Sequence, residues 1–222
     1  MKPIDRVRSE FDEIAGLSSQ FPELLGPHEA ALLRAIPGGC GAALDIGCGT
    51  GALVRRLAAR CQHVVGIDLS PRMIAHARRR SATYRNIEYH VSEAREWLNL
   101  TRSYECITSM AVLHHMEIEP TLQSVIRSLR PGGILLLVDI LDRPGWRNRP
   151  LNTVTWVFAC LRNLILRRRL PSLALNKAWA HHGHGETYLT IGQAREIFDR
   201  LLPGCIVRQH LFWRYSVTWT KP

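Results

Sequence analysis

The sequence predicts an α/β protein with a Rossmann-like core, a mostly parallel seven-stranded sheet with helices on both faces. Short apolar segments typical of strands alternate with amphipathic helical segments from about residue 40 to residue 140. A glycine-rich turn, in the stretch LDIGCGTG at residues 44–51, joins the first strand to the first helix. The chain has 222 residues, of which 46% are hydrophobic, and this is enough for one sizeable core.

The elements of this core are expected in a regular order. Residues 43–46 form the first strand, and Leu53, Val54 and Leu57 give the next segment the apolar face of a helix. Ser70 is the expected N-cap of a second helix, with Pro71 in its first turn. Further strands are expected at residues 63–68, 87–91, 104–110, 134–140, 205–211 and 215–220, and further helices at residues 94–98, 120–129 and 191–202. The stretch RPGG at 130–133 is typical of a turn.

Composition and charge restrict the classes of protein. The six cysteines lack C-x-x-C spacing, which predicts reduced thiols and a cytoplasmic location. The N-terminus has no apolar signal region, and no segment reaches the roughly 20 apolar residues of a spanning helix. A formal charge of +10 is compatible with nucleic acid, an anionic membrane face or an acidic substrate, although an arginine excess is often only compositional.

Two acids near the glycine turn indicate what it binds. Asp68 ends the second strand, at the distance where dinucleotide-binding proteins place an acid for the ribose hydroxyls. The glycines, however, follow G-x-G-x-G, and Asp45 precedes them. A carboxylate beside a pyrophosphate would repel it, so Asp45 favours a ligand with a positive group, such as a cofactor with an amino-acid end, a ribose and an adenine. In the alternative, both acids only cap helices.

Five motifs in register carry a family resemblance. LDIGCGTG, GIDLS, the SEA of residues 92–94, SMAVLHHM and LRPGGILLLVDI resemble the motifs of class I S-adenosylmethionine-dependent methyltransferases, in the small-molecule branch related to ubiquinone-type enzymes. The match covers about residues 40–140. It implies one methyltransferase domain over residues 1–222. Its parts are an N-terminal helical lid or cap (1–38), the cofactor-binding core (40–140), a helical, acceptor-side insertion after the fifth strand (141–190), and a closing helix with antiparallel strands (191–222).

The resemblance also implies which residues bind S-adenosyl-L-methionine. The glycine-turn backbone faces the methionine portion, Asp68 takes both ribose hydroxyls, and Met110 lies near the sulfonium. Glu93 stands where the family commonly has an aspartate for the adenine amino group, so that contact departs from the pattern. The predicted cofactor-binding residues are Asp45, Gly47, Cys48, Gly49, Gly51, Asp68, Leu69, Met73, Glu93, Ala94 and Met110. Met73 is equally well explained as a core residue.

The candidate catalytic residues are His114 and His115, which follow the fourth strand where related enzymes face the transferring methyl group. A histidine suits proton abstraction near neutral pH, although adjacent side chains cannot both point into one pocket. In the alternative, one of the two histidines is a packing or helix-capping residue, and the other only lines the site. We predict no metal ligand, because the histidine-rich loop at 181–184 lacks i, i+4 spacing and has no evident carboxylate or cysteine partner beyond Glu186. That loop is expected to line the acceptor pocket.

Two other segments are expected to cover the site. Phe11, Phe21 and His28 form a lid, or an amphipathic helix docked on the sheet. In the segment 153–169, the side chains of Trp156, Phe158 and Leu161 are expected to wall an apolar acceptor pocket. The same segment suits peripheral membrane contact, a homodimer interface or a core helix.

The function that follows is methyl transfer to an O, N or C nucleophile of a small, apolar or aromatic acceptor. RNA or lipid-associated methylation is an alternative, but residues 109–112 read SMAV where an N-P-P-Y-like tetrapeptide would mark a nucleic-acid acceptor. A dinucleotide oxidoreductase and a non-catalytic, cofactor-binding regulatory protein are the alternatives of other classes.

Overall fold

A computed structural model describes residues 2–18, 33–36, 38–100, 103–142, 144, 153, 173–210 and 213–222. Its centre is a seven-stranded sheet in the order β3-β2-β1-β4-β5-β7-β6. The first five strands run parallel, and β7 is antiparallel to both β5 and β6. The strands are β1 (Cys40–Ile46), β2 (Cys61–Asp68), β3 (Ile87–Val91), β4 (Tyr104–Met110), β5 (Leu129–Ile140), β6 (Ile206–His210) and β7 (Arg214–Thr220). The predicted fold class is confirmed.

Helices cover both faces of this sheet. On one face, Leu53 and Ile74 belong to a core built with α3 and α4, while on the other Trp97, Leu122 and Phe198 bring α5, α6 and α9 against the strands. The helices are α1 (Ile4–Ser18), α3 (Ala52–Leu57), α4 (Pro71–Arg80), α5 (Ala94–Leu98), α6 (Ile118–Ser128), α8 (Leu173–Gly183) and α9 (Ile191–Leu201), with a short 3-10 helix η1 (Leu113–His115). Strand alternation fills both cores, since neighbouring residues of a strand point to opposite faces.

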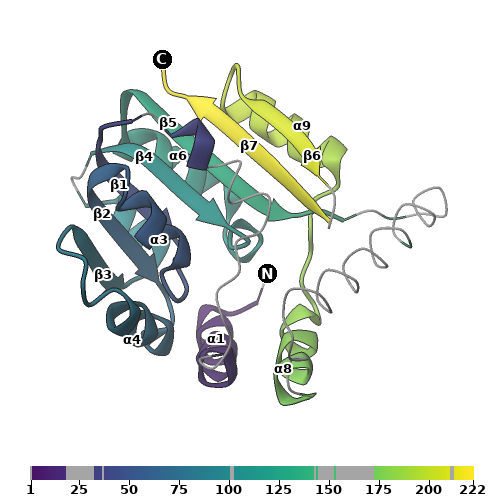
Figure 1. The fold of residues 1–222 in the computed structure, drawn as a ribbon. Coiled ribbons are helices and arrows are strands. Elements are labelled where there is room, and N and C mark those ends of the chain that lie inside the picture. The colour runs from purple at the N-terminus through teal and green to yellow at the C-terminus, as the bar shows by residue number, and fades with distance from the viewer. Residues whose placement is uncertain are drawn as a thin grey trace.

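The connectivity fixes where a ligand binds. The chain proceeds from β1 outward to β2 and β3, then returns to place β4 on the other side of β1. Ligands of open α/β sheets bind beyond the carboxyl ends of the strands at such a switch point. Figure 1 shows α1 and α8 beyond this edge of the sheet, with the N-terminus near them. The two helices contact each other, so they cover the switch point together.

The expected elements agree closely with the observed ones, with two differences. The stretch 130–133 lies inside β5 and not in a turn, because Gly132 and Gly133 exchange backbone hydrogen bonds with Lys221 and the Lys221 side chain holds the carbonyl of Leu129. The histidine run at 181–184 is also not a loop, since His181 and His182 form the last turn of α8.

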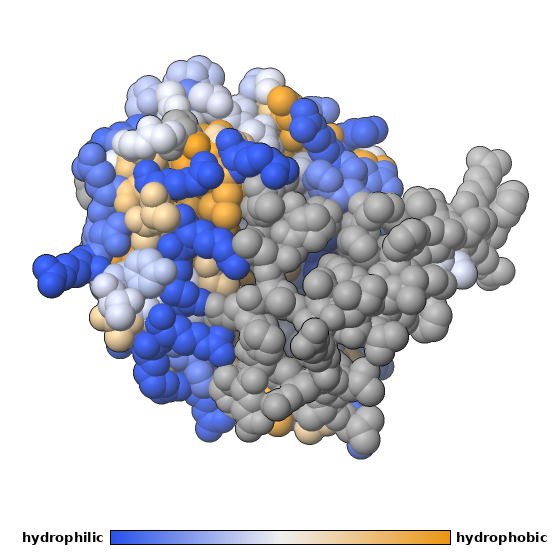
Figure 2. Space-filling model, viewed as in Figure 1, coloured by the Kyte–Doolittle hydropathy of each residue, from blue (hydrophilic) through white to orange (hydrophobic). Residues whose placement is uncertain are grey.

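Several predictions concern residues outside those that the structure describes. They are the lid residues Phe21 and His28, and the wall residues Trp156, Phe158 and Leu161 of the segment 153–169, of which only Thr153 is described. Among the described helices, none has the length and apolar character needed to cross a membrane. Figure 2 shows hydrophilic side chains interspersed with smaller hydrophobic areas on the coloured surface at the left of the view.

Candidate functional site

The glycine turn leaves β1 with its backbone turned toward the switch point. Gly47 has φ +69° and Gly49 has φ +53°, which L side chains rarely adopt. A Cβ on Gly47 would lie 2.3 Å from Val112 Cγ2, whereas a Cβ on Gly49 would meet nothing within 4 Å. Gly47 is therefore required by packing, and Gly49 leaves open space for a ligand.

Asp68 is held rigidly at the end of β2. Its two carboxylate oxygens accept the backbone N–H groups of Gly49 (2.9 Å) and Ser70 (2.9 Å). Burial raises the pKa of Asp68, the two N–H groups oppose that rise, and the nearby Asp12 carboxylate adds to it. The carboxylate is thus fixed across the glycine turn, where it can accept hydrogen bonds from a ligand.

The helix that follows links this end of the site to α1. The Ser70 hydroxyl accepts the backbone N–H of Met73 at 3.0 Å, which confirms Ser70 as the N-cap of α4 and Pro71 as its first residue. The same hydroxyl donates to the Asp12 carboxylate of α1, which also accepts the N–H of Arg72. Helix α1 is thereby fixed to the residues beside Asp68.

One cavity of about 790 Å³ lies between the glycine turn, the strand ends and α1, a volume suited to small ligands. The predicted site residues that line it are Gly47, Gly49, Asp68, Leu69, Met73, Glu93, Ala94, Met110 and His115. Glu93 uses its carboxylate to cap α5 through the N–H of Arg95. The cavity therefore joins residues that the sequence assigned to cofactor and to catalysis.

Other predicted site residues lie behind this wall. Asp45 is buried and accepts the Thr108 hydroxyl at 2.7 Å. Cys48 is buried, which raises the pKa of its thiol, and a Cβ on Gly51 would meet the Tyr89 hydroxyl at 2.2 Å. Asp45, Cys48 and Gly51 therefore pack behind the glycine turn, and they do not line the cavity.

The segment after β4 carries backbone strain at the cavity wall. Ala111 has φ +56°, uncommon for a residue with a Cβ, and its N–H donates to the carbonyl of Val138 at 2.7 Å. Such strain concentrates at functional sites. It turns the chain from β4 into η1, which places His115 in the cavity wall and His114 behind it.

The two histidines have different environments. His114 Nδ1 lies 2.7 Å from Asp139 Oδ1, and the Asp139 carboxylate also accepts the backbone N–H groups of His114 and Ile140. Burial and the neighbouring His114 lower the pKa of His115 to about 4. His115 is therefore uncharged at neutral pH and a weak proton acceptor there.

A buried ionic cluster joins α1 to α8 beside these histidines. Lys2 Nζ lies 2.9 Å from Glu10 Oε2 and 3.0 Å from Glu186 Oε1, and Glu10 Oε2 lies 2.8 Å from His182 Nδ1. Burial favours the neutral form of Glu10, but Lys2, Arg6 and His182 outweigh it and lower its pKa to about 2. Glu10 is thus ionised in the folded protein.

Sequence reasoning missed Lys2, Glu10 and Asp139, and it mentioned Glu186 only as a neighbour of the histidine run. Asp139 gave one usable signal, because it is the single acid within the apolar strand ILLLVDI. Lys2 and Glu10 gave none, since the partners that join them to the site, His182 and Glu186, lie 172 or more residues away along the chain.

A mostly parallel sheet with a glycine turn and an acid at its switch point is typical of Rossmann-like proteins that bind a ribose-containing cofactor. The family model for a methyltransferase domain matches residues 43–133. An uncharacterized methyltransferase of Mycobacterium tuberculosis is 31% identical over 201 residues, covering 88% of this chain and 95% of that protein.

Solved structures show the same fold. The complex of DhpI with SAH (S-adenosyl-L-homocysteine) is similar with a TM-score of 0.69 at 21% identity, over 99% of this chain and 97% of that one. The N-methyltransferase NodS from Bradyrhizobium japonicum, also in complex with S-adenosyl-L-homocysteine, has a TM-score of 0.61 at 15% identity, over 97% and 98% of the two chains.

The chain belongs to the class I S-adenosylmethionine-dependent methyltransferase family. The predictions of the family, of an enzyme and of S-adenosyl-L-methionine as its cofactor are confirmed. The acceptor is a separate question, because neither the family model nor the mycobacterial relative specifies one.

Proposed function

We propose that this methyltransferase binds S-adenosyl-L-methionine along the glycine turn and transfers its methyl group to a small, apolar or aromatic acceptor in the same cavity. Asp68 accepts the ribose hydroxyls, and Leu69 and Met73 lie against the adenine. The Gly49 backbone faces the methionine portion, and Met110 lies near the sulfonium. The open space at Gly49 and the fixed carboxylate of Asp68 support this arrangement.

The observation that carries the acceptor class is the continuity of the cavity. From Asp68 it extends without a break to Phe11, His115, Met116 and Trp179. Phe11 packs edge-on against His115, with ring centroids 5.6 Å apart, and against Trp179, with centroids 6.5 Å apart. An apolar or aromatic molecule is desolvated by such a wall, and alignment of acceptor and sulfonium contributes much of the rate.

A proton acceptor is needed where the acceptor's nucleophile carries a proton. The Asp139 carboxylate accepts a hydrogen bond from His114 Nδ1–H, which leaves the lone pair of the imidazole on Nε2, as in other carboxylate–histidine pairs. His115 stands between this pair and the cavity. We propose that His114 and His115 serve as the catalytic residues, with His115 in the cavity wall and His114 oriented behind it by Asp139.

A lipid-like acceptor is a second candidate. Ile4 and Trp179 line the cavity and are nevertheless 44% and 48% exposed, so its mouth is apolar. A net charge of +10 would favour an anionic lipid surface. We also propose a cytoplasmic location, peripheral membrane contact, a homodimer and the four-part division of the domain. Five of the described cysteines are free thiols, and this supports a reducing compartment such as the cytoplasm.

The test combines binding with transfer. Calorimetry measures the affinity for S-adenosyl-L-methionine and, as a control for the oxidoreductase alternative, for NAD. Methyl-labelled cofactor is then incubated with a panel of small phenols, amines and carboxylic acids, with anionic phospholipid vesicles and with total RNA. We expect cofactor binding and label in a small apolar acceptor. Label found only in RNA would contradict the proposed acceptor class, and cofactor binding without transfer to any of them would favour the regulatory alternative.

A further inference from the structure

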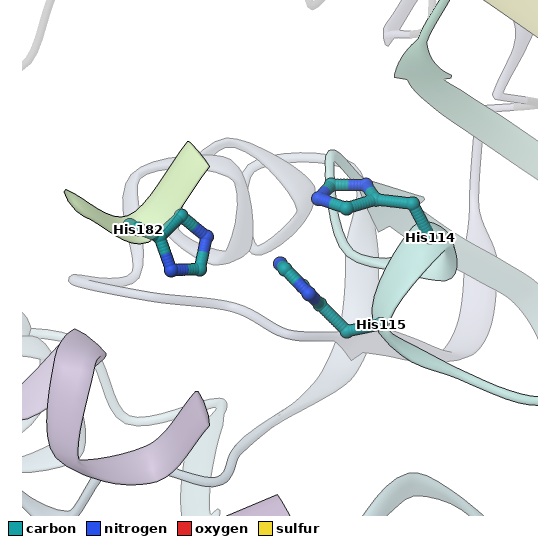
Figure 3. A group of neighbouring side chains, drawn as sticks. All are labelled: His114, His115 and His182. Atoms are coloured by element: carbon teal, nitrogen blue, oxygen red, sulfur yellow. The ribbon is translucent and has the colours of Figure 1, made fainter. Parts of the chain in front are cut away.

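Three imidazoles meet beside the acceptor end of the cavity. His114 and His115 belong to η1 after β4, and His182 comes from the last turn of α8. The ring centroid of His115 lies 3.9 Å from that of His114 and 4.9 Å from that of His182. One ring nitrogen from each histidine lies within 4.8 Å of one from each of the other two. Figure 3 shows the three rings converging on one small space.

Two of these imidazoles are oriented by buried carboxylates. Asp139 accepts the backbone N–H groups of His114 and Ile140, and His114 donates its Nδ1–H to the same carboxylate. Glu10 orients His182 in the same way through Nδ1 at 2.8 Å. In both histidines the remaining nitrogen, Nε2, carries a lone pair. For His114 this nitrogen points toward the other two rings (Figure 3). Metal-binding histidines are typically held by such second hydrogen bonds to carboxylates.

His115 lacks any hydrogen bond that would satisfy its ring. Both of its ring nitrogens are buried without a hydrogen-bond partner among the residues that the structure describes. Leaving a buried polar group unpaired costs about 1–3 kcal/mol, so an unfilled coordination role explains these nitrogens better than packing does. The nearest acid is Glu186, whose Oε2 lies 3.3 Å from His115 Nδ1.

The charges around the imidazoles favour a cation. Glu10, Glu186 and Asp139 are buried carboxylates that contact the three histidines. The described basic side chains in ion pairs with them are Lys2, which joins Glu10 and Glu186, and Arg6, which pairs with Glu10. With neutral imidazoles, this group of charges carries one net negative charge, and burying it is costly unless a cation is added.

We propose that His114, His115 and His182 bind one divalent transition-metal cation, and that Asp139, Glu10 and Glu186 position the three ligands. Three imidazoles suit zinc or a similar metal, and three protein ligands leave a fourth position for an outside molecule. Because His115 lines the cavity, that position faces the acceptor end. An acceptor with an oxygen or nitrogen donor would be anchored there. The proposal reverses the expectation of no metal, which rested on the spacing within residues 181–184 and on the few possible partners near them in the sequence.

The geometry of a loaded site sets a limit on the movement required. Zinc–nitrogen distances of about 2.0–2.1 Å in a tetrahedron place the ligand nitrogens about 3.4 Å apart. The three candidate ligand nitrogens now lie up to 4.8 Å apart, so each ring would move inward by roughly 1 Å at most. Rotation of the side chains is enough, because α8 and η1 already face each other across the cluster.

The test is metal binding by the full-length chain, independent of methyl transfer. After treatment with a chelator, Zn²⁺ is titrated in competition with a zinc indicator, and Co²⁺ is titrated while the visible absorption of tetrahedral cobalt is followed. We expect one equivalent of each metal to bind. The affinity should fall roughly 100-fold or more in His182→Ala and His115→Ala, and roughly 10–100-fold in Asp139→Asn.

The matched control is His184→Ala, which removes an exposed histidine just beyond α8 whose ring bonds the carbonyl of Ala180. Retained affinity for S-adenosyl-L-methionine shows that each variant is folded, and unchanged metal affinity in this control supports the site. A wild-type chain that binds cofactor but no equivalent of Zn²⁺ or Co²⁺ would overturn the proposal, as would equal losses in His184→Ala and His182→Ala. Both readouts are binding measurements, of metal and of cofactor, so the test does not depend on finding the methyl acceptor.

Discussion

The cofactor end and the acceptor end of the cavity are built by different means. At the cofactor end, backbone groups form most of the site. The glycine turn has positive φ angles, and backbone N–H groups hold Asp68 in place. At the acceptor end, side chains from α1, η1, β5 and α8 meet, and Lys2 contacts His182 across 180 residues of chain. One end depends on local geometry and the other on packing between distant segments.

This difference indicates where specificity can change. A backbone-built site tolerates few substitutions, since its shape is its function, and it suits a cofactor shared by a whole family. A site built from side chains on separate elements can be altered one residue at a time while the sheet remains intact. We therefore expect acceptor choice to reside in α1 and α8, and cofactor choice in β1 and β2.

The largest expected effect tests whether the glycine turn divides into a packing glycine and a ligand glycine. Gly47→Ala forces a Cβ into Val112 and keeps a left-handed backbone, so the free energy of unfolding should fall by about 3 kcal/mol. Gly49→Ala carries only the backbone cost of about 1 kcal/mol. Urea unfolding measures both. Calorimetry should show that Gly49→Ala nevertheless binds S-adenosyl-L-methionine poorly. Equal losses of stability in the two variants would remove the distinction.

At the acceptor end, substitution should affect turnover and leave the cofactor in place. His114→Ala and His115→Ala are each expected to lower kcat roughly 100-fold, because a free imidazole would take the acceptor's proton and a metal-bound imidazole would hold the cation that anchors the acceptor. Cofactor affinity, measured by calorimetry, should remain as in the wild type. His63→Ala, an exposed histidine on β2, is the control. Full turnover in both active-site variants would mean that alignment alone drives the transfer.

The cofactor end was largely predictable from the sequence because its signals are local. Three elements, at 87–91, 94–98 and 104–110, were predicted with the observed bounds, and Ser70 was identified as an N-cap. The turn expected at 130–133 was wrong, because pairing with the chain end at Lys221 extends β5 through two glycines. Local turn preference cannot register a partner 88 residues away.

The acceptor end was predictable only in part. His114 and His115 were identified from their place after β4, and His182 was noted as one of a histidine run. Their assembly was not predicted, because it depends on how α8 packs against α1, and on Glu10, which resembles any surface acid of an amphipathic helix. Contacts between side chains far apart in the chain produce no periodic pattern or fixed spacing that a single sequence could reveal.

A smaller effect is expected when Asp68, the side chain proposed to accept the ribose hydroxyls, is removed. Asp68→Ala should weaken S-adenosyl-L-methionine binding by more than tenfold, since a charged hydrogen-bond acceptor contributes about 1.5–3 kcal/mol. The free energy of unfolding should also fall, by about 1–3 kcal/mol, because the backbone N–H groups of Gly49 and Ser70 lose their acceptor. Glu88→Ala, an exposed acid on β3, is the control for calorimetry. Unchanged affinity in Asp68→Ala would contradict the assignment of the ribose site.

The smallest expected effect concerns the mouth of the acceptor end. Trp179 lines the cavity, packs edge-on against Phe11 and His182, and is 48% exposed. An apolar acceptor that covers part of this exposed ring should gain about 1 kcal/mol from it. Trp179→Ala should therefore raise the KM for such an acceptor roughly 5-fold, by the same free energy, while cofactor affinity is unchanged. Tyr84→Ala removes a comparably exposed aromatic side chain away from the cavity and should change neither constant. If Trp179→Ala keeps the wild-type KM but loses affinity for anionic vesicles, Trp179 belongs to a membrane-facing surface, and the acceptor wall must be formed by other side chains.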